Sequence, residues 1–406
     1  MYLQRSHYLK KIEPFIDKEI IKILTGVRRC GKSVLLSQVK ASLRERGVPE
    51  ERLISMNFDT FETGENLDAA EIYQMVKAKS VEFGGKLYVF FDEVHELSGW
   101  EKLVNSCATE LGCDMYITGS NSKMLSKEYA SLLTGRYITF TIFPFSFAEA
   151  LSLRLLQGKE LPAQEVFADY LVFGGMPFIY QLDDRHSRLQ YLRDVAEAII
   201  SKDITERYNI RDVDLLKRTI VFLLSNIGSL FSANSVANFF RAQGRSVSWE
   251  TISNYVEHVK TACLFLSAIQ SEITGKEILR APEKLYLSDH GFREALYGKN
   301  QINASQVLEN MVYLELIRND YQVTIGKVGK QEIDFVATKD NRTVYLQVCY
   351  LLANEEIAER EFRPLKEIRD NFPKLVLSLD SLDLSRDGIL HLNVIDFLAD
   401  SRTAMI

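Results

Sequence analysis

The sequence predicts an α/β protein whose amino-terminal third is a parallel β-sheet covered by helices on both faces. Short apolar runs alternate with helical stretches there, a pattern typical of βαβ units. The run LYVFF (87–91) is apolar at every position, as expected for a strand buried on both faces. A glycine-rich segment, GVRRCGKS (26–33), separates the first predicted strand from the first long helix.

In the first predicted domain, residues 1–150, we expect five strands and two long helices. Each strand is a short apolar run, and Pro144 follows the last of them. The helices carry apolar residues at helical spacing. The strands are expected at 20–25, 53–58, 87–91, 115–118 and 137–142, and the helices at 32–46 and 69–83.

The rest of the chain divides into three predicted segments. Residues 151–210 form a helical connector interrupted near Gly174 and Pro177. Residues 211–298 show three helices, two of them capped by Ser232 and Ser248, and a β-hairpin, which is a winged-helix pattern. Residues 299–406 have the order αβββαβ, with helices at 306–318 and 355–369 and strands at 322–327, 332–338, 343–350 and 375–378.

The composition is that of an ordinary globular chain. It has 406 residues, 49 Lys and Arg, 55 Asp and Glu, and a net charge of −6. This mildly acidic balance does not favour a protein that coats nucleic acid or lies on a membrane surface. No run of about 18 apolar residues predicts a membrane span, and the first residues lack the apolar core of a signal peptide. Five scattered cysteines without a CxxC pair predict a reduced, cytoplasmic protein.

The segment 26–33 has the GxxxxGKS spacing of a phosphate-binding loop. Its two glycines let the backbone curl, so that successive N–H groups point at phosphate oxygens, and the following helix adds its positive end. Lys32 is expected to reach the β- and γ-phosphates, and Ser33 to ligate Mg²⁺. We therefore expect ATP and Mg²⁺ as ligands. The predicted nucleotide-binding residues are Gly26, Val27, Arg28, Arg29, Cys30, Gly31, Lys32, Ser33 and Val34.

Two acids, Asp92 and Glu93, end the buried strand about 60 residues after this loop. In a parallel sheet, the carboxyl ends of the strands face the ligand crevice. Asp92 is then expected to hold Mg²⁺ through its water shell, and Glu93 to act as general base toward the attacking water. Two acids at a strand end mean little alone, and the assignment depends on the loop that precedes them.

Further catalytic candidates follow the next strand. In TGSN (118–121), Ser120 and Asn121 both qualify to position water or to sense the γ-phosphate, and the sequence does not choose between them or against a plain turn. Arg136 is a candidate for stabilising transition-state charge, in its own subunit or in a neighbouring one. An ordinary surface arginine is an equally good interpretation of Arg136.

Three residues near the loop have simpler interpretations. At least one of Arg28 and Arg29 is expected to point away from the nucleotide, because such loops bind phosphate mainly through the backbone. Cys30 is most simply a small loop residue, and a helix start is a place where a thiol pKa can be lowered. His95, two residues after Glu93, is close enough in sequence to touch the site, although a loop residue is the favoured interpretation.

Several segments of the chain resemble those of a known family. GVRRCGKSVLL, FFDEVHE, ITGSNSKML, LTGRYITFTIFPFSFAEAL and FGGMP resemble segments of bacterial and archaeal AAA-superfamily ATP-binding proteins with a C-terminal domain of unknown function. LENMVYLEL, QEIDFVA and VYLQVCYLL resemble that C-terminal domain. The resemblance implies a P-loop NTPase core with Lys32, Ser33, Asp92 and Glu93 in their usual roles. It also implies a winged-helix connector and a restriction-endonuclease-like terminal fold.

The tail has only part of a nuclease site. Such folds use an acid on the second strand and an E-x-K on the third. Asp334 stands where the first acid belongs, and Glu309 offers a helix carboxylate, but the third strand has Gln347 and Cys349 in place of Glu and Lys. An amide is a weaker Mg²⁺ ligand than a carboxylate. We therefore expect a degenerate site and a domain that binds a partner or stabilises the ATPase.

The winged-helix segment does not have the charge of a typical DNA-binding module. Residues 211–298 contain 10 Lys and Arg and 9 Asp and Glu, a net charge of +1. The candidate recognition helix carries Glu250 and Glu257 besides Lys260. DNA binding is therefore less favoured than a contact with a protein partner.

The main functional hypothesis is Mg²⁺-dependent ATP hydrolysis that drives a conformational switch. The alternative is an ATP-gated module that binds DNA or protein with little turnover, and an ATP-dependent nuclease is the least favoured. The intact pair Asp92 and Glu93 favours hydrolysis, and the missing E-x-K opposes the nuclease. A protein partner is expected, a homo-oligomer is left open, and no membrane partner is expected.

Overall fold

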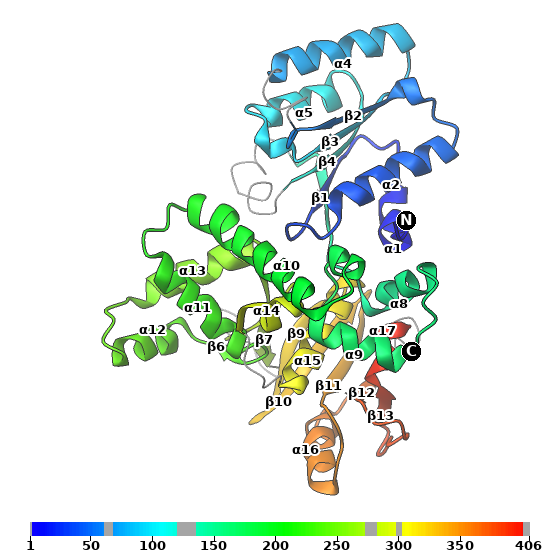
Figure 1. Ribbon diagram of the computed structural model, residues 1–406. Coiled ribbons are helices and arrows are strands. Elements are labelled where there is room, and N and C mark those ends of the chain that lie inside the picture. Colours follow the sequence, from blue (N-terminus) through cyan, green and yellow to red (C-terminus); the bar gives the residue numbers. More distant parts are fainter. Residues whose placement is uncertain (1, 61–67, 120–134, 273–281, 298–302, 401–406) are drawn as a thin grey trace. The chain divides into compact units, whose positions relative to one another are not determined.

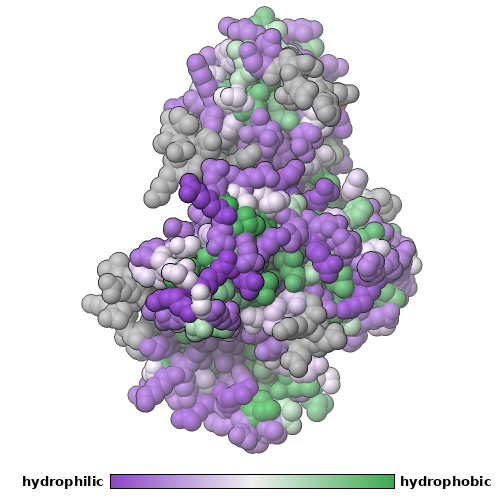
Figure 2. Space-filling view, turned by 60° about the vertical axis from the view of Figure 1, so that its left-hand side comes forward, coloured by the Kyte–Doolittle hydropathy of each residue, from purple (hydrophilic) through white to green (hydrophobic). Residues whose placement is uncertain are grey.

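The computed structural model describes residues 2–60, 68–119, 135–272, 282–297 and 303–400 (Figure 1). The chain divides into two compact units, Met1–Phe143 and Pro144–Ile406, so the first unit ends before the expected boundary at residue 150. No helix in the described ranges combines the length and the apolar character that crossing a bilayer requires. On the face drawn in Figure 2, apolar residues form small patches among hydrophilic ones.

The first unit is built on a parallel sheet, as the sequence predicts. In the described residues its strand order is β2-β3-β4-β1-β5, and every neighbouring pair is parallel. The carboxyl ends of all these strands therefore lie at one edge of the sheet. The strands are β1 (Ile21–Thr25), β2 (Leu53–Asn57), β3 (Tyr88–Asp92), β4 (Asp114–Thr118) and β5 (Tyr137–Thr141), each within a residue or so of its expected bounds.

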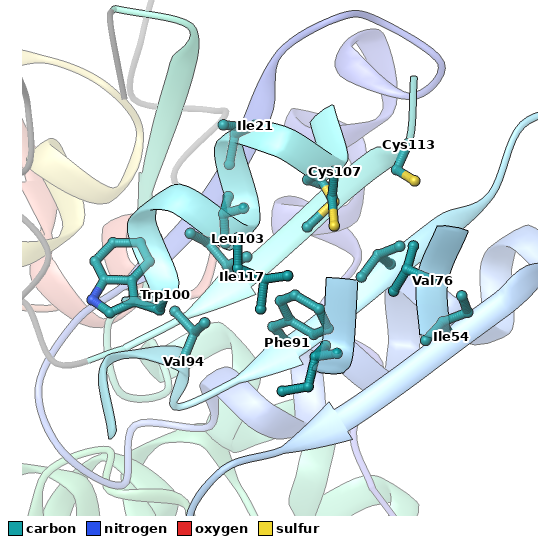
Figure 3. Packing of buried hydrophobic residues seen from close by; sticks show 14 of the residues in the cluster. Ile21, Ile54, Val76, Phe91, Val94, Trp100, Leu103, Cys107, Cys113 and Ile117 are labelled. Atoms are coloured by element: carbon teal, nitrogen blue, oxygen red, sulfur yellow. The ribbon is translucent and has the colours of Figure 1, made fainter. Parts of the chain in front are cut away.

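Helices cover both faces of this sheet (Figure 1). The helices α4 (Ala69–Phe83) and α5 (Trp100–Thr109) bury Val76 and Leu103 against Phe91 and Ile117 of β3 and β4 (Figure 3). The helix α2 (Lys32–Glu45) packs against β1, β3 and β4 from the other side, and α1 (Ser6–Ile12) packs on α2. The sequence analysis predicted α2 and α4 but neither α1 nor α5.

A buried ion pair joins β1 and β4 at the edge opposite their carboxyl ends. Lys22 and Asp114 are both fully buried and form a short salt bridge. Asp114 also accepts hydrogen bonds from the Tyr116 hydroxyl and from the Asp17 N–H, each at 2.9 Å. Burial lowers the pKa of Lys22, and the attraction of Asp114 opposes this shift. Removing one partner leaves the other charge buried without compensation.

The second unit begins with helices. They are α8 (Phe147–Leu156), α9 (Ala163–Phe173), α10 (Arg185–Ala198), which continues as a π-helical segment (Ile199–Glu206), α11 (Val213–Ser225), α12 (Ala233–Ala242), α13 (Trp249–Thr261) and α14 (Gly291–Tyr297). The predicted caps are confirmed, because the Ser232 and Ser248 side chains accept hydrogen bonds from the N–H groups of Ser235 and Thr251. These bonds satisfy donors that have no partner within the helix.

The two glycines of the FGGMP segment pack directly against the buried carboxylate of Asp289. The Gly175 N–H donates to Asp289 Oδ2 at 2.8 Å, and a Cβ on Gly174 would lie 1.9 Å from Asp289 Oδ1. Gly174 also has a φ of 72°, which a side chain rarely adopts. Burial raises the pKa of Asp289 to about 7, against the effect of these backbone hydrogen bonds. The glycine pair is therefore required by packing within the second unit.

One mixed sheet runs through the middle and the tail of the chain. Its described strands have the order β13-β12-β11-β10-β9-β7-β8-β6, and β7 pairs with β9 in parallel. The expected boundary at 298/299 therefore does not separate two sheets. The strands are β6 (Leu230–Phe231), β7 (Phe265–Glu272), β8 (Glu283–Leu287), β9 (Gln322–Val328), β10 (Gln331–Lys339), β11 (Arg342–Val348), β12 (Lys374–Ser378) and β13 (Leu390–Asn393).

Three helices belong to the tail: α15 (Ala304–Arg318), α16 (Glu355–Lys366) and α17 (Val394–Ala399). The order αβββαβ is confirmed over residues 304–378, and β13 and α17 continue it beyond the expected elements. The winged-helix and restriction-endonuclease-like assignments stay predictions.

Replacing Asp114 with Ala should destabilise the first unit by about 3–5 kcal/mol, because it leaves the Lys22 ammonium buried and unpaired. The double variant Lys22→Met/Asp114→Leu should recover most of this loss. Urea denaturation measures the free energy of unfolding of both variants. Hydrogen exchange of the β1 and β4 amides measures the local effect. An Asp114→Ala chain within about 1 kcal/mol of the parent would show that the pair contributes little.

Candidate functional site

The turn between β1 and α2 is a tight curl that only glycine permits at its first position. Gly26 has a φ of 140°, and a Cβ there would lie 2.1 Å from the carbonyl oxygen of Ile142. Gly31 has a φ of 102° immediately before α2 begins. The N–H groups of the first helical turn have no partner within the helix, so they are available to an anion.

Lys32 places its ammonium inside this curl. Its Nζ donates to the carbonyl oxygens of Gly26 at 3.3 Å and of Val27 at 3.4 Å. The side chain is 5% exposed, and its Nζ lies 4.0 Å from Glu93 Oε1. The Lys32 ammonium and the start of α2 therefore lie close together at the carboxyl edge of the sheet.

Ser33 and Asp92 meet beside the loop. The Ser33 hydroxyl donates to Asp92 Oδ1 at 3.1 Å, and both residues line a pocket of about 370 Å³ together with Ser37, Lys40 and Asn57. A hydroxyl and a carboxylate oxygen this close are ligands of the kind that Mg²⁺ takes, with the remaining positions left to water and phosphate. The donor set therefore fits Mg²⁺.

Thr118, the last residue of β4, forms hydrogen bonds with both Asp92 and Glu93. Its hydroxyl donates to Asp92 Oδ1 and accepts the N–H of Glu93 at 2.9 Å. Glu93 needs this support because its φ of 49° lies in the left-handed region. Thr118 was not among the predicted site residues, which after β4 began two residues later, at Ser120. The sequence signal that could have identified Thr118 is its position at the carboxyl end of an apolar strand.

The Glu93 carboxylate lies between two groups that can carry positive charge. One oxygen lies 4.0 Å from Lys32 Nζ, and the other lies 3.4 Å from His95 Nδ1. His95 Nε2 in turn lies 2.9 Å from Glu96 Oε1. Burial raises the pKa of Glu93, and Lys32 opposes this shift. His95 therefore belongs to the site, contrary to its expected place as a plain loop residue.

Comparison with known proteins identifies the family. A family model described as an AAA domain matches residues 18–151, and a model described as a domain of unknown function matches residues 164–303. An uncharacterised protein of Haemophilus influenzae is 34% identical over 399 residues, which are 98% of either chain. The chain belongs to the AAA superfamily of P-loop proteins. An uncharacterised protein of Methanocaldococcus jannaschii is 29% identical to this AAA protein over 90% of the chain and 81% of its own length.

A solved structure, the Aeropyrum pernix ORC1 protein in complex with DNA, has 11% identity and a TM-score of 0.32 over 74% of this AAA protein and 93% of that chain. The model of unknown function covers the middle of the chain, whereas the sequence resemblance associated such a domain with the tail.

The structure corrects the role of Arg136 within its own subunit. The Arg136 carbonyl accepts the N–H of Ile21, and its side chain is exposed at the start of β5. Because β5 runs parallel to β1, this start lies at the edge opposite the loop, about 16 Å away over five residues. Arg136 is therefore remote from the phosphate loop of its own chain, and action on a neighbouring subunit stays a prediction.

Other loop predictions have mixed outcomes. Arg29 is exposed and Arg28 half-buried, in line with the expectation that one of them points away, and Val34 is half-buried in the first turn of α2. Cys30 is fully buried, and burial raises its thiol pKa, which is the opposite of a lowering at the helix start. Ser120 and Asn121 lie outside the described residues.

The structure brings most of the nuclease-like residues of the tail together. Gln347 Oε1 accepts the N–H of Asp334 at 2.7 Å, and Glu309 and Asp334 both face the ammonium of Lys284. Cys349 packs in a buried apolar cluster with Ile333 and Phe362. The sequence analysis did not identify Lys284, which comes from β8.

Proposed function

We propose that this AAA protein binds ATP with Mg²⁺ and hydrolyses it. The observation that carries the proposal is the convergence of Lys32, Ser33, Asp92 and Glu93 at one edge of the sheet, through contacts of 3.1 Å between Ser33 and Asp92 and 4.0 Å between Lys32 and Glu93. Lys32 and Ser33 begin α2 after the turn that follows β1, and Asp92 and Glu93 lie at the end of β3. Because β1 and β3 are parallel strands of one sheet, both groups lie at the same edge.

Each group has a distinct part in this proposal. The N–H groups of residues 26–33 and the Lys32 ammonium would bind the phosphates, and Ser33 and Asp92 would hold Mg²⁺. When bound, Mg²⁺ neutralises phosphate charge. Glu93 accepts a proton from the attacking water, and its raised pKa makes it a better base than an exposed carboxylate. Thr118 and His95 fix the position of Glu93.

We also infer that hydrolysis drives a conformational change, and the course of the chain after β5 supports this. The Ile142 N–H donates to the Thr25 carbonyl at 2.7 Å, next to Gly26 in the first unit. Three residues later, Phe145 is fixed within the second unit, where its N–H donates to the Gly175 carbonyl at 2.7 Å and its carbonyl accepts the Tyr170 hydroxyl at 2.9 Å. The backbone from Ile142 to Phe145, which is hydrogen-bonded at both ends, therefore connects the surroundings of the phosphate loop to the second unit.

Replacing Glu93 with Gln should preserve ATP binding and lower kcat by about 10²–10⁴, because the amide cannot accept the proton. Phosphate release at saturating ATP and Mg²⁺ measures turnover, and calorimetry measures binding. Glu51→Gln, at an exposed position before β2, is the control for the lost charge. Equal turnover in the parent and in Glu93→Gln would overturn the catalytic assignment. Negligible turnover in a parent chain that binds ATP would favour an ATP-gated binding module.

Thr118→Val should lower kcat by about ten- to a hundredfold with a smaller effect on KM, because it removes two hydrogen bonds that hold Asp92 and Glu93. Thr118→Ser keeps the hydroxyl and should retain most of the activity. Steady-state kinetics together with Tm separates this effect from misfolding. If the valine and serine variants turn over ATP equally, the hydroxyl does not position Glu93.

A further inference from the structure

A buried lysine from the middle of the chain lies among three acids of the tail. Lys284 on β8 is 4% exposed, and its Nζ lies 3.0 Å from Glu309 Oε1, 2.6 Å from Glu332 Oε1 and 4.0 Å from Asp334 Oδ1. Glu309 comes from α15, and the other two acids come from β10. Three carboxylates on two elements thus converge on one ammonium from a third.

The surrounding contacts hold these acids in place. The Tyr286 hydroxyl donates to Glu309 Oε1 at 2.7 Å, and the Val348 N–H donates to Asp334 Oδ2 at 2.8 Å. Gly228 closes the other side, since a Cβ there would lie 3.0 Å from Glu309 Oε2. The carboxylates are therefore held by β8, β11 and the Gly228 turn as well as by the ammonium.

The charges in this cluster depend on one another. Burial alone would lower the pKa of Lys284, but the attraction of Glu309, Asp334 and Glu332 outweighs it and raises the pKa above its usual value. Burial also raises the pKa of Glu309 and of Asp334. Lys284 is therefore protonated at neutral pH, and its charge makes it possible to bury the acids.

The ammonium is the cation around which the three carboxylates gather. Divalent cations in proteins are held by oxygen ligands of several carboxylates around one point, and here that point is taken by Nζ. Within the described ranges, no group of three or more His, Cys, Asp and Glu side chains is arranged to hold a metal ion. Beside the cluster lies a pocket of about 720 Å³ lined by Glu332, Asp334 and Gln347, so ions have access to it.

We propose that Lys284 is the built-in cation of this cluster, standing where a divalent metal would bind and making the tail independent of metal. The lysine of the middle segment then blocks a latent metal site on the tail. This proposal goes beyond ATP hydrolysis and does not depend on it.

The test removes the ammonium from the full-length chain and offers Mn²⁺ in its place. All chains carry Asp92→Asn, to remove the metal ligand beside the phosphate loop, and no nucleotide is added. Lys284→Met should lower Tm by several degrees, and added Mn²⁺ should restore it with one bound ion per chain, seen by electron paramagnetic resonance. Lys284→Arg keeps the charge and should show no response to Mn²⁺.

Two controls make the result specific. Adding Asp334→Asn to Lys284→Met should abolish Mn²⁺ binding. Lys260→Met removes an ammonium that lies 2.9 Å from Glu257 and 3.0 Å from Glu283, only two acids, and should not create a Mn²⁺ site.

Three outcomes would overturn the proposal. The first is Mn²⁺ binding by the chain that retains Lys284, abolished by Asp334→Asn, because the ammonium then does not fill the site. The second is a folded Lys284→Met chain that binds no Mn²⁺. The third is a Lys284→Met chain that stays unfolded even with Mn²⁺, because a divalent cation then does not replace the ammonium.

Discussion

The close approach of Gly26 to the carbonyl of Ile142 is the constraint on which the phosphate loop depends. No side chain fits between them, so the chain turns sharply as it leaves β1. This turn directs the Lys32 ammonium back onto the carbonyl groups of Gly26 and Val27, and it places the start of α2 at the carboxyl edge of the sheet. The positive end of a helix and a buried cation are thereby brought together at one point.

The strand order determines which other groups reach this point. Because β4 lies between β1 and β3, the hydroxyl of Thr118 stands next to Asp92 at the end of β3. It also bonds the N–H of Glu93 and so supports a backbone conformation that is uncommon for a glutamate. One threonine therefore couples the proposed metal ligand to the proposed base, and this coupling depends on the parallel sheet rather than on the loop.

The elements and the loop were predictable because their signals are local. Apolar runs mark the strands, and the GxxxxGKS spacing requires its own backbone geometry. The predictions that were wrong or missing depend on contacts that are not visible in the local sequence. Arg136 is adjacent to a strand, but the sequence does not show which edge of the sheet that strand end occupies. The pKa of Cys30 is raised by burial, which the local sequence does not show. Lys284 and Glu332 are 48 residues apart and meet only through the shared sheet.

The most direct test of the nucleotide site is calorimetry with ATP and Mg²⁺ on the parent chain and on Lys32→Ala. The loop geometry predicts binding of about one ATP per chain by the parent and a loss of binding in a folded Lys32→Ala chain, because the ammonium inside the curl is the group proposed to contact the phosphates. A folded parent chain that releases no heat, or a Lys32→Ala chain that binds ATP as tightly as the parent, would contradict the account.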